Sequence, residues 1–129
     1  MYILNFSHPI TQSQIEQIEQ LLSPVKVDKV INYRIAFDPN ESFYNQLTTF
    51  WEQQPFLMDE LENASFLVNL PAHNVIAALL LSHFHGLMGF FPTVIRLKVN
   101  GELTPTTFEL AEIINLQNVR EKARLFRKY

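Results

Sequence analysis

Three segments of the chain share one pattern: a short apolar run, an Asn, one further apolar residue and then a break. They are residues 3–9 (ILNFSHP), 67–71 (LVNLP) and 113–117 (IINLQ). We interpret each segment as a buried strand that ends in a polar, turn-forming group, with a helix to follow. In an open α/β sheet the carboxyl ends of the strands line up along one edge, where ligands bind. The pattern therefore predicts a polar pocket at such an edge.

The remaining apolar periodicity predicts strands that alternate with helices, in the order β-α-β-α-β-α-β-β-α. We expect strands over residues 2–6, 30–37, 66–70, 93–99 and 108–116, helices over 11–22, 42–53, 75–87 and from 117 onward, and a helical turn over 57–61. This alternation favours right-handed crossovers and a mostly parallel sheet. The turn signal at Asn100 and Gly101 predicts that the last two strands are antiparallel. The predicted fold is an α/β Rossmann-like three-layer sandwich with one antiparallel hairpin near the C-terminus.

Local signals refine these expectations at a few positions. Thr11 and Gln14 have the spacing of a capping box at the start of the first helix. Asn74 is expected to cap the helix over 75–87. Polar residues alternate with apolar ones over 30–37, which predicts a strand with one exposed face near an edge of the sheet.

The composition indicates a soluble globular protein with one domain over residues 1–129. The chain is 47% hydrophobic and contains no cysteine, so neither disulfide nor thiolate chemistry is expected, as in a reducing cytoplasm. The longest apolar stretch, residues 75–91, is interrupted by Ser, His and Gly. It is too short and too polar to cross a bilayer, which takes about 20 apolar residues. We therefore expect a cytoplasmic protein that does not bind membranes.

The net charge of −3 hides an asymmetry, because five of the ten Lys and Arg residues lie in the last ten residues. The rest of the chain is acidic, which argues against binding to long nucleic acids. The basic tail has two interpretations. It is a solvated C-terminal helix whose cations suit the negative end of the helix dipole, or its first cation, Arg120, reaches a phosphate.

The first candidate site group follows the first predicted strand. Backbone N–H groups at the next helix, together with Asn5 and Ser7, can hold a phosphate without a cation. His8 can pair with a phosphate or act as a base, since histidine changes its charge closer to neutral pH than other side chains do. The alternative is that Asn, Ser and Pro here form an ordinary turn.

Two further groups follow the other segments with the same pattern. Beyond Asn69 and Pro71, the helix that starts near Asn74 points its N-terminus at the predicted edge, with His73 beside it. The alternative for Asn74 is a cap only. Asn115 and Gln117 carry the same ambiguity, and Arg96 either lines the pocket or faces solvent.

Several kinds of chemistry are not expected from this sequence. No G-x-G-x-x-G follows the first strand, so we expect no dinucleotide cofactor. His83 and His85 lie two residues apart on a helix and face different sides, and no ligand cluster accompanies them, so no metal site is expected. We interpret His83 as a packed or hydrogen-bonded core residue. No nucleophile elbow is present either.

Four segments together resemble a small CRISPR-associated accessory family of the Csx series, which is found with type III systems. They are residues 3–9, 67–71, 85–97 and 111–120, and they keep this order across nearly the whole chain. The resemblance implies one CARF-like domain, a compact relative of the Rossmann-like sensor of cyclic oligoadenylates. The implied ligand is a cyclic oligoadenylate, in the first place the tetra-adenylate.

The resemblance also implies a homodimer, or a higher assembly on ligand binding, that holds the ring across a two-fold axis. Amide side chains would then hold phosphates and read adenine edges, while Phe6 or Leu70 packs on a base. The expected ligand-binding residues are Asn5, Phe6, Ser7, His8, Asn69, Leu70, Pro71, His73, Asn74, Arg96, Asn115, Gln117 and Arg120.

A lone sensor domain of this kind can sequester the messenger or cleave it. Cleavage in related domains needs no metal, because the ribose 2′-OH attacks the adjacent phosphate. His8 is the first candidate for a base and His73 the second. Two alternatives stay open: a dedicated ring nuclease, and a dimeric adaptor with no small-molecule site, in which the strand-end Asn residues only form turns and caps.

Overall fold

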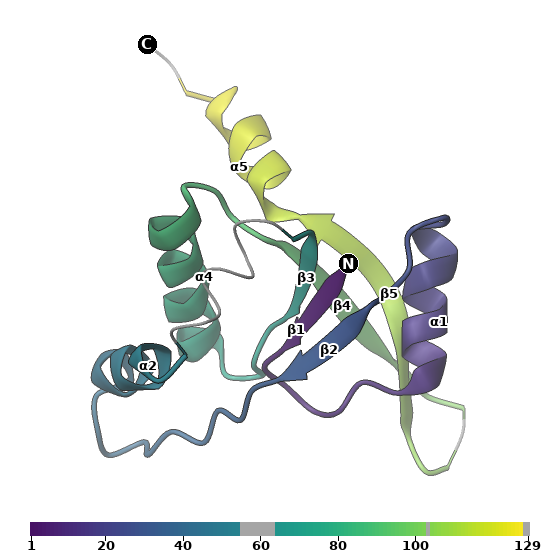
Figure 1. The fold of residues 1–129 in the computed structure, drawn as a ribbon, viewed down its shortest axis with the longest axis horizontal. Helices are drawn as coiled ribbons and strands as arrows, with labels where there is room; N and C mark the ends of the chain where they lie inside the picture. Colours follow the sequence, from purple (N-terminus) through teal and green to yellow (C-terminus); the bar gives the residue numbers. More distant parts are fainter. Residues whose placement is uncertain (55–63, 103, 128–129) are drawn as a thin grey trace.

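A computed structural model describes residues 1–54, 64–102 and 104–127 and shows an α/β fold around one sheet (Figure 1). The strands are β1 (Tyr2–Asn5), β2 (Lys29–Asn32), β3 (Phe66–Asn69), β4 (Thr93–Asn100) and β5 (Thr107–Asn115). The helices of the described part are α1 (Gln12–Leu21), α2 (Phe43–Glu52), α4 (Asn74–Met88) and α5 (Leu116–Arg124). The predicted order of these elements is confirmed. The helical turn expected over 57–61 lies outside the described residues.

The five strands lie in the order β2-β1-β3-β4-β5. β1 pairs in parallel with β2 and β3, β3 pairs in parallel with β4, and β5 is antiparallel to β4. The expectation of a mostly parallel sheet with one antiparallel pair near the C-terminus is therefore confirmed. The chain adds β2 on one side of β1 and then adds β3 on the other side. The direction in which strands are added to the sheet therefore reverses between β1 and β3. In open α/β sheets ligands bind outside the carboxyl ends of the strands at such a reversal.

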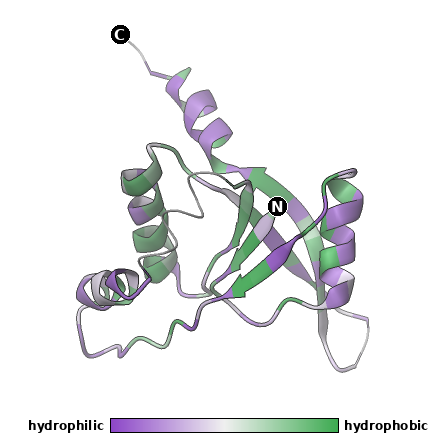
Figure 2. Cartoon of the chain, in the orientation of Figure 1, coloured by the Kyte–Doolittle hydropathy of each residue, from purple (hydrophilic) through white to green (hydrophobic). Residues whose placement is uncertain are grey.

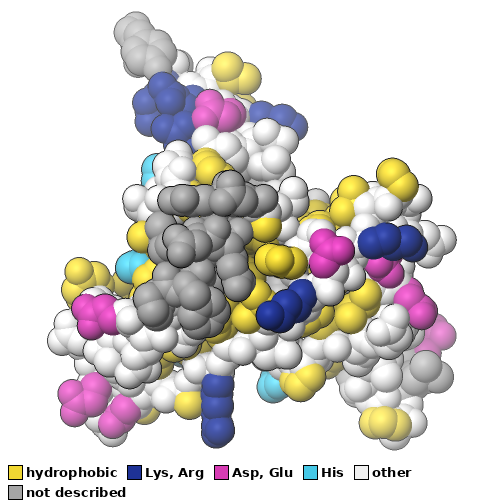
Figure 3. Space-filling model, viewed as in Figure 1, with side chains coloured by type: hydrophobic (Ala, Val, Ile, Leu, Met, Phe, Trp, Pro, Cys, Tyr) yellow, Lys and Arg dark blue, Asp and Glu magenta, His cyan; other side chains and the backbone are white. Residues whose placement is uncertain are grey.

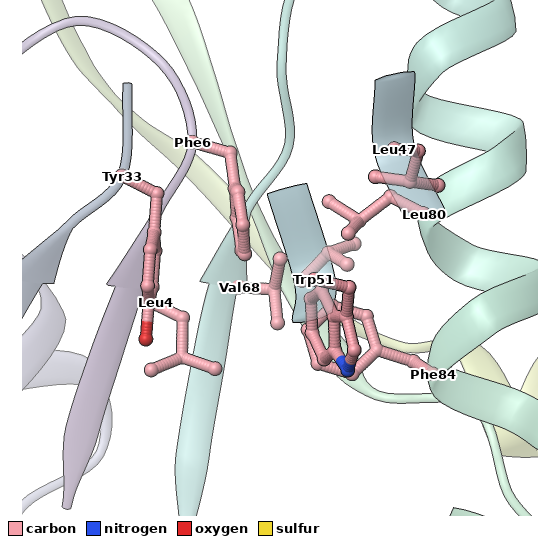
Figure 4. Close-up of a cluster of buried hydrophobic side chains, with 9 residues drawn as sticks. Leu4, Phe6, Tyr33, Leu47, Trp51, Val68, Leu80 and Phe84 are labelled. Carbon is pink, nitrogen blue, oxygen red and sulfur yellow. The ribbon is translucent and has the colours of Figure 1, made fainter. Parts of the chain in front are cut away.

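Helices cover both faces of the sheet, α2 and α4 on one face and α1 on the other (Figures 1 and 2). The larger core lies under α2 and α4, where Trp51 and Phe84 meet strand residues such as Val68 (Figure 4). The smaller core joins Ile18 of α1 to β1, β3 and β4. Because both faces are covered, β1 and β3 consist of nearly continuous apolar runs.

Helix α5 differs from the other helices. It projects from one end of the sheet, it is hydrophilic along its length (Figure 2), and none of its residues is buried. Its last turn carries Lys122 and Arg124, which suit the negative end of the helix dipole. No described helix combines the length and the apolar character that crossing a membrane requires.

The N-terminus of α1 is fixed by the predicted capping box. The Thr11 side chain accepts from the Gln14 backbone N–H, and the Gln14 side chain accepts from the Thr11 N–H. Gln14 also donates to the carbonyl oxygen of Phe108, and Gln17 accepts from the N–H of Leu110. Two glutamines of α1 thus use backbone groups on the outer edge of β5, beside which the described residues place no further strand.

The second strand is shorter than predicted, since it ends at Asn32 rather than at residue 37. Among the described strands its one neighbour is β1, whose last residue, Asn5, is paired with Asn32, so none of them continues the pairing beyond this point. Tyr33 then turns into the core and stacks on Phe6 with ring centroids 4.7 Å apart. The expected position at an edge of the sheet is confirmed.

Candidate functional site

Three Asn side chains lie in a row at the carboxyl ends of β2, β1 and β3, because Asn5 is in register with both Asn32 and Asn69. The central side chain, 1% exposed, uses all its hydrogen-bonding capacity. Its Nδ2 donates to the carbonyl oxygen of His8 and to Asn32 Oδ1, each at 2.9 Å. Its Oδ1 accepts from Ser7 N at 3.1 Å and from Asn69 Nδ2 at 2.9 Å. We call this row, Asn69–Asn5–Asn32, the amide ladder.

Backbone groups fix the direction of the amide ladder. Ser7 N–H can only donate and the carbonyl of His8 can only accept, so the oxygen and nitrogen of the Asn5 amide cannot be interchanged. Asn69 must therefore donate to Asn5, and Asn32 must accept from it. This direction leaves an acceptor oxygen, Oδ1, available at the Asn69 end of the ladder and a donor, Nδ2, available at the Asn32 end.

Two adjoining cavities open at the reversal between β1 and β3. The first, about 470 Å³ and here named the β4-side cavity, lies between the ends of β1 and β3 and the β4–β5 hairpin. The second, about 300 Å³ and here named the β2-side cavity, lies between the segment after β2 and the start of α4. Both are lined by Ser7, His8 and Ala72. The predicted residues that line one or both cavities are Phe6, Ser7, His8, Asn69, Leu70, Pro71, His73 and Arg96.

The side chains that line the two cavities and can carry a charge near neutral pH are all basic. His8 and Arg96 line the β4-side cavity, and His8, Arg34 and His73 line the β2-side cavity. Among the described residues no Asp or Glu lines either one, although the whole chain carries a net charge of −3. Such a lining favours an anionic ligand.

The two arginines differ in what they contact. Arg96 pairs across the strands with Glu112 of β5, with 2.7 Å between Nη2 and Oε2. Arg34 forms no ion pair with any described residue and is exposed beside the β2-side cavity. Sequence reasoning missed Arg34, because the segment that carries it was expected to continue as a strand. The available signal was that Arg34 follows Asn32, a further Asn after an apolar pair, by two residues.

His73, rather than Asn74, is the N-cap of α4, which corrects the expectation for that helix. The imidazole Nδ1 of His73 accepts from the N–H of Val75 at 3.2 Å, and Asn74 Oδ1 accepts from the same group at 2.8 Å. Because Nδ1 accepts, the proton of the neutral ring lies on Nε2, and His73 offers the β2-side cavity a donor. Asn74 lines a different depression along α4, together with residues such as Ser82.

His8 is exposed between the two cavities. Its carbonyl oxygen is held by Asn5, but its ring forms no hydrogen bond with the described residues. A general base is ordinarily oriented by a further group. The described part of the chain provides no such group for His8.

Phe6 does not lie as expected for a residue that packs on a ligand base. It is 3% exposed, its face is stacked on Tyr33, and Phe50 and Phe84 approach it edge-on. Figure 4 shows Phe6 inside the core between Tyr33 and the side chains of α2 and α4. Phe6 therefore offers a ligand base little surface, whereas Leu70, the other residue expected to pack on a base, lines the β4-side cavity.

The third predicted segment does not lie at the carboxyl ends of the parallel strands. It lies at their opposite, amino-terminal ends. Asn115 is paired with Thr93, the first residue of β4, because β5 runs antiparallel. The expectation that all three segments converge is thus wrong for Asn115 and for the residues that follow it. Asn115 caps α5, Gln117 accepts from the N–H of Phe91, and Arg120 pairs with Glu121. Figure 3 shows the basic side chains that gather over α5.

A separate pair of polar groups lies in the helical layer. The rings of Trp51 and His83 meet with centroids 4.8 Å apart, and Trp51 Nε1 and His83 Nε2 are buried without a hydrogen-bond partner among the described residues. Burial lowers the pKa of His83 from its ordinary value of 6.5. His83 is therefore a packed residue, as its sequence context predicted.

The lowered pKa of His83 predicts a stability change in acid. Below pH 6.5 the unfolded chain binds a proton at this residue that the folded chain resists, so the free energy of unfolding falls as the pH drops from 6.5 toward the folded pKa. In His83→Gln, the difference in unfolding free energy between about pH 7.5 and about pH 5.5 should be smaller than in the native protein. Denaturant titrations at the two pH values measure it. An equal difference in both proteins would contradict the assignment.

Comparison of the chain with protein-family models, with curated proteins and with solved structures gives no match.

Proposed function

We propose that the protein binds a cyclic oligoadenylate, in the first place cyclic tetra-adenylate, at the carboxyl ends of β1 and β3. The fold would then be a single Rossmann-like, CARF-like domain of the kind that the sequence resemblance implies. The observation that carries the proposal is the basic lining of two adjoining cavities at the reversal of strand order, without a lining carboxylate among the described residues. This is where an anionic ligand of an open α/β sheet is expected.

The groups around the cavities suit a ringed phosphodiester. Arg34 and Arg96 can form charge-assisted hydrogen bonds with phosphate oxygens. The Nε2–H of His73 and the hydroxyl of Ser7 add neutral donors. A cyclic tetranucleotide has a two-fold axis, so a homodimer that shares this axis lets each protomer provide half of the contacts.

We propose sequestration as the way in which the protein lowers the free level of the messenger in cytoplasmic type III CRISPR signalling. Slow, metal-independent cleavage by the ribose 2′-OH would need a well-placed base. The His8 ring has no described partner that would hold it for this role, which supports binding over turnover.

Calorimetric titration with rings of three, four and six adenylates tests the proposal. We expect the tetra-adenylate to bind most tightly, with one ring for two chains, and its affinity to fall as salt is raised. At 100 times the dissociation constant the ring should add about 2.7 kcal/mol to the free energy of unfolding. No heat and no thermal shift with any ring would favour an adaptor without a small-molecule site.

Chromatography of the labelled ring after incubation with the protein distinguishes binding of the ring from its cleavage. Sequestration predicts that the ring is recovered intact after hours with excess protein. Linear products would instead assign ring-nuclease activity, and a His8→Ala variant that abolished them without weakening binding would identify the base.

A further inference from the structure

The β4-side cavity combines apolar walls with an exposed aromatic ring. Leu70, Ile95 and Leu97 contribute to its walls, and Phe108, 52% exposed, lies at its side. The backbone of Phe108 is fixed, since Gln14, itself 5% exposed, donates to its carbonyl oxygen at 3.0 Å. An exposed aromatic side chain on a fixed backbone offers a face on which a nucleobase can stack.

One buried acceptor faces the same cavity. Asn69 is 8% exposed and lines the β4-side cavity. The amide ladder uses its Nδ2, and no described group donates to its Oδ1. This oxygen is not among the polar atoms sealed inside the protein, so it opens onto the cavity that Asn69 lines. Water can solvate this oxygen while the cavity is empty. A ligand that displaces the water without donating a hydrogen bond would leave the acceptor unpaired, which is costly, whereas a ligand group that donates to the oxygen avoids this cost.

The structure restricts which bases this oxygen accepts. Because the backbone at Ser7 and His8 fixes the direction of the amide ladder, Asn69 cannot turn its amide to present an N–H instead. A base with an exocyclic amine, such as adenine, can donate to it. A base with a carbonyl at that position would set two acceptors against each other.

We propose that the β4-side cavity is the subsite that reads the base, with Phe108 as the stacking platform and Asn69 Oδ1 as the acceptor for an exocyclic amine. The inference rests on the proposed function and deepens it, because it makes Asn69 a specificity-determining residue. Asn5 is then a positioning residue, which acts through Asn69 and touches no ligand. A ribose hydroxyl is the other donor of the same ligand that such an oxygen can accept.

Three synthetic rings distinguish these donors in the native protein: cyclic tetra-adenylate, the same ring built from purine riboside, and the same ring built from deoxyadenosine. The purine riboside ring lacks only the amines, and the deoxy ring lacks only the 2′-hydroxyls. We expect the purine riboside ring to bind at least about tenfold more weakly than the adenylate ring, since it leaves Asn69 Oδ1 unpaired. The deoxy ring should show no comparable loss.

Two variants complete the test. Asn69→Ala should bind the adenylate and purine riboside rings with nearly equal affinity, because the acceptor is gone. Phe108→Ala should weaken both rings by about tenfold through lost stacking. Phe90→Ala is the matched control, since Phe90 is 45% exposed and precedes β4 at the opposite edge of the sheet. It should leave both affinities unchanged.

The possible failures can be told apart. Equal binding of the adenylate and purine riboside rings to the native protein would overturn the base-reading role of Asn69 and leave the proposed function intact. A loss confined to the deoxy ring would mean that the oxygen reads a ribose hydroxyl, which also overturns the assignment. Failure of every ring to bind would overturn the proposed function and the inference with it. The comparison of rings uses the native protein, so it stands even if Asn69→Ala does not fold.

Discussion

Asn5→Asp should lower the free energy of unfolding by about 3 kcal/mol or more at neutral pH. The substitution keeps the shape of the side chain but replaces Nδ2 by an oxygen that faces two acceptors, the His8 carbonyl and Asn32 Oδ1. Each buried polar group left without its partner costs about 1–3 kcal/mol. Small domains have roughly 5–15 kcal/mol in total, so the loss is large. Urea denaturation followed by the fluorescence of Trp51, the only Trp of the chain, measures it.

The same chemical change at the ends of the amide ladder provides the controls. Asn32 only accepts in the ladder, so Asn32→Asp should cost less than about 0.5 kcal/mol. Asn69 donates through Nδ2, so Asn69→Asp should cost about 1–3 kcal/mol. Equal losses at Asn32 and Asn5 would show that the ladder runs in another direction, and would remove the basis for an acceptor at Asn69.

The double variant Arg34→Gln/Arg96→Gln should bind cyclic tetra-adenylate about a hundredfold more weakly than the native protein. Each arginine lines a cavity and can form a charge-assisted hydrogen bond with a phosphate, worth about tenfold in affinity. The dependence of affinity on salt should become shallower in the double variant. Calorimetric titration at two salt concentrations measures both effects.

The matched control for this variant is Arg120→Gln/Arg124→Gln. It removes the same charge, but from α5, at the edge of the sheet opposite the cavities. Its affinity should stay within about twofold of the native value. An equal loss in both double variants would mean that the effect depends on net charge alone, or that α5 contributes to the site, and would count against the two cavities.

Local sequence patterns predicted the order of the strands and helices because each element carries its own signal. Apolar runs identified β1 and β3, and the spacing of Thr11 and Gln14 identified the start of α1. The antiparallel pair could be predicted from the turn at Asn100 and Gly101. Local patterns do not contain the register or the direction of pairing between strands. These decide which side chains meet at the candidate site.

The three strand-end segments illustrate this limit. Residues 113–117 have the same pattern as residues 3–9 and 67–71, but β5 runs antiparallel to the other strands. Asn115 therefore lies beside the first residue of β4, away from the carboxyl ends of β1 and β3. Asn32 was not predicted to lie beside Asn5, because that position follows only from the parallel pairing of β1 and β2. The buried position of Phe6 depends in the same way on Tyr33, which leaves the sheet after β2.

The glutamines of α1 restrict how two copies of this chain can meet. Gln14 and Gln17 already bind the carbonyl oxygen of Phe108 and the N–H of Leu110 on the outer side of β5. Another strand therefore cannot pair with β5 at these two groups. The other end is β2, which is four residues long and begins with an exposed Lys29. A continuous ten-stranded sheet through β5 is thereby disfavoured. If two copies share a ring as proposed, we expect them to meet through helices, loops or the cavity rims rather than through β5.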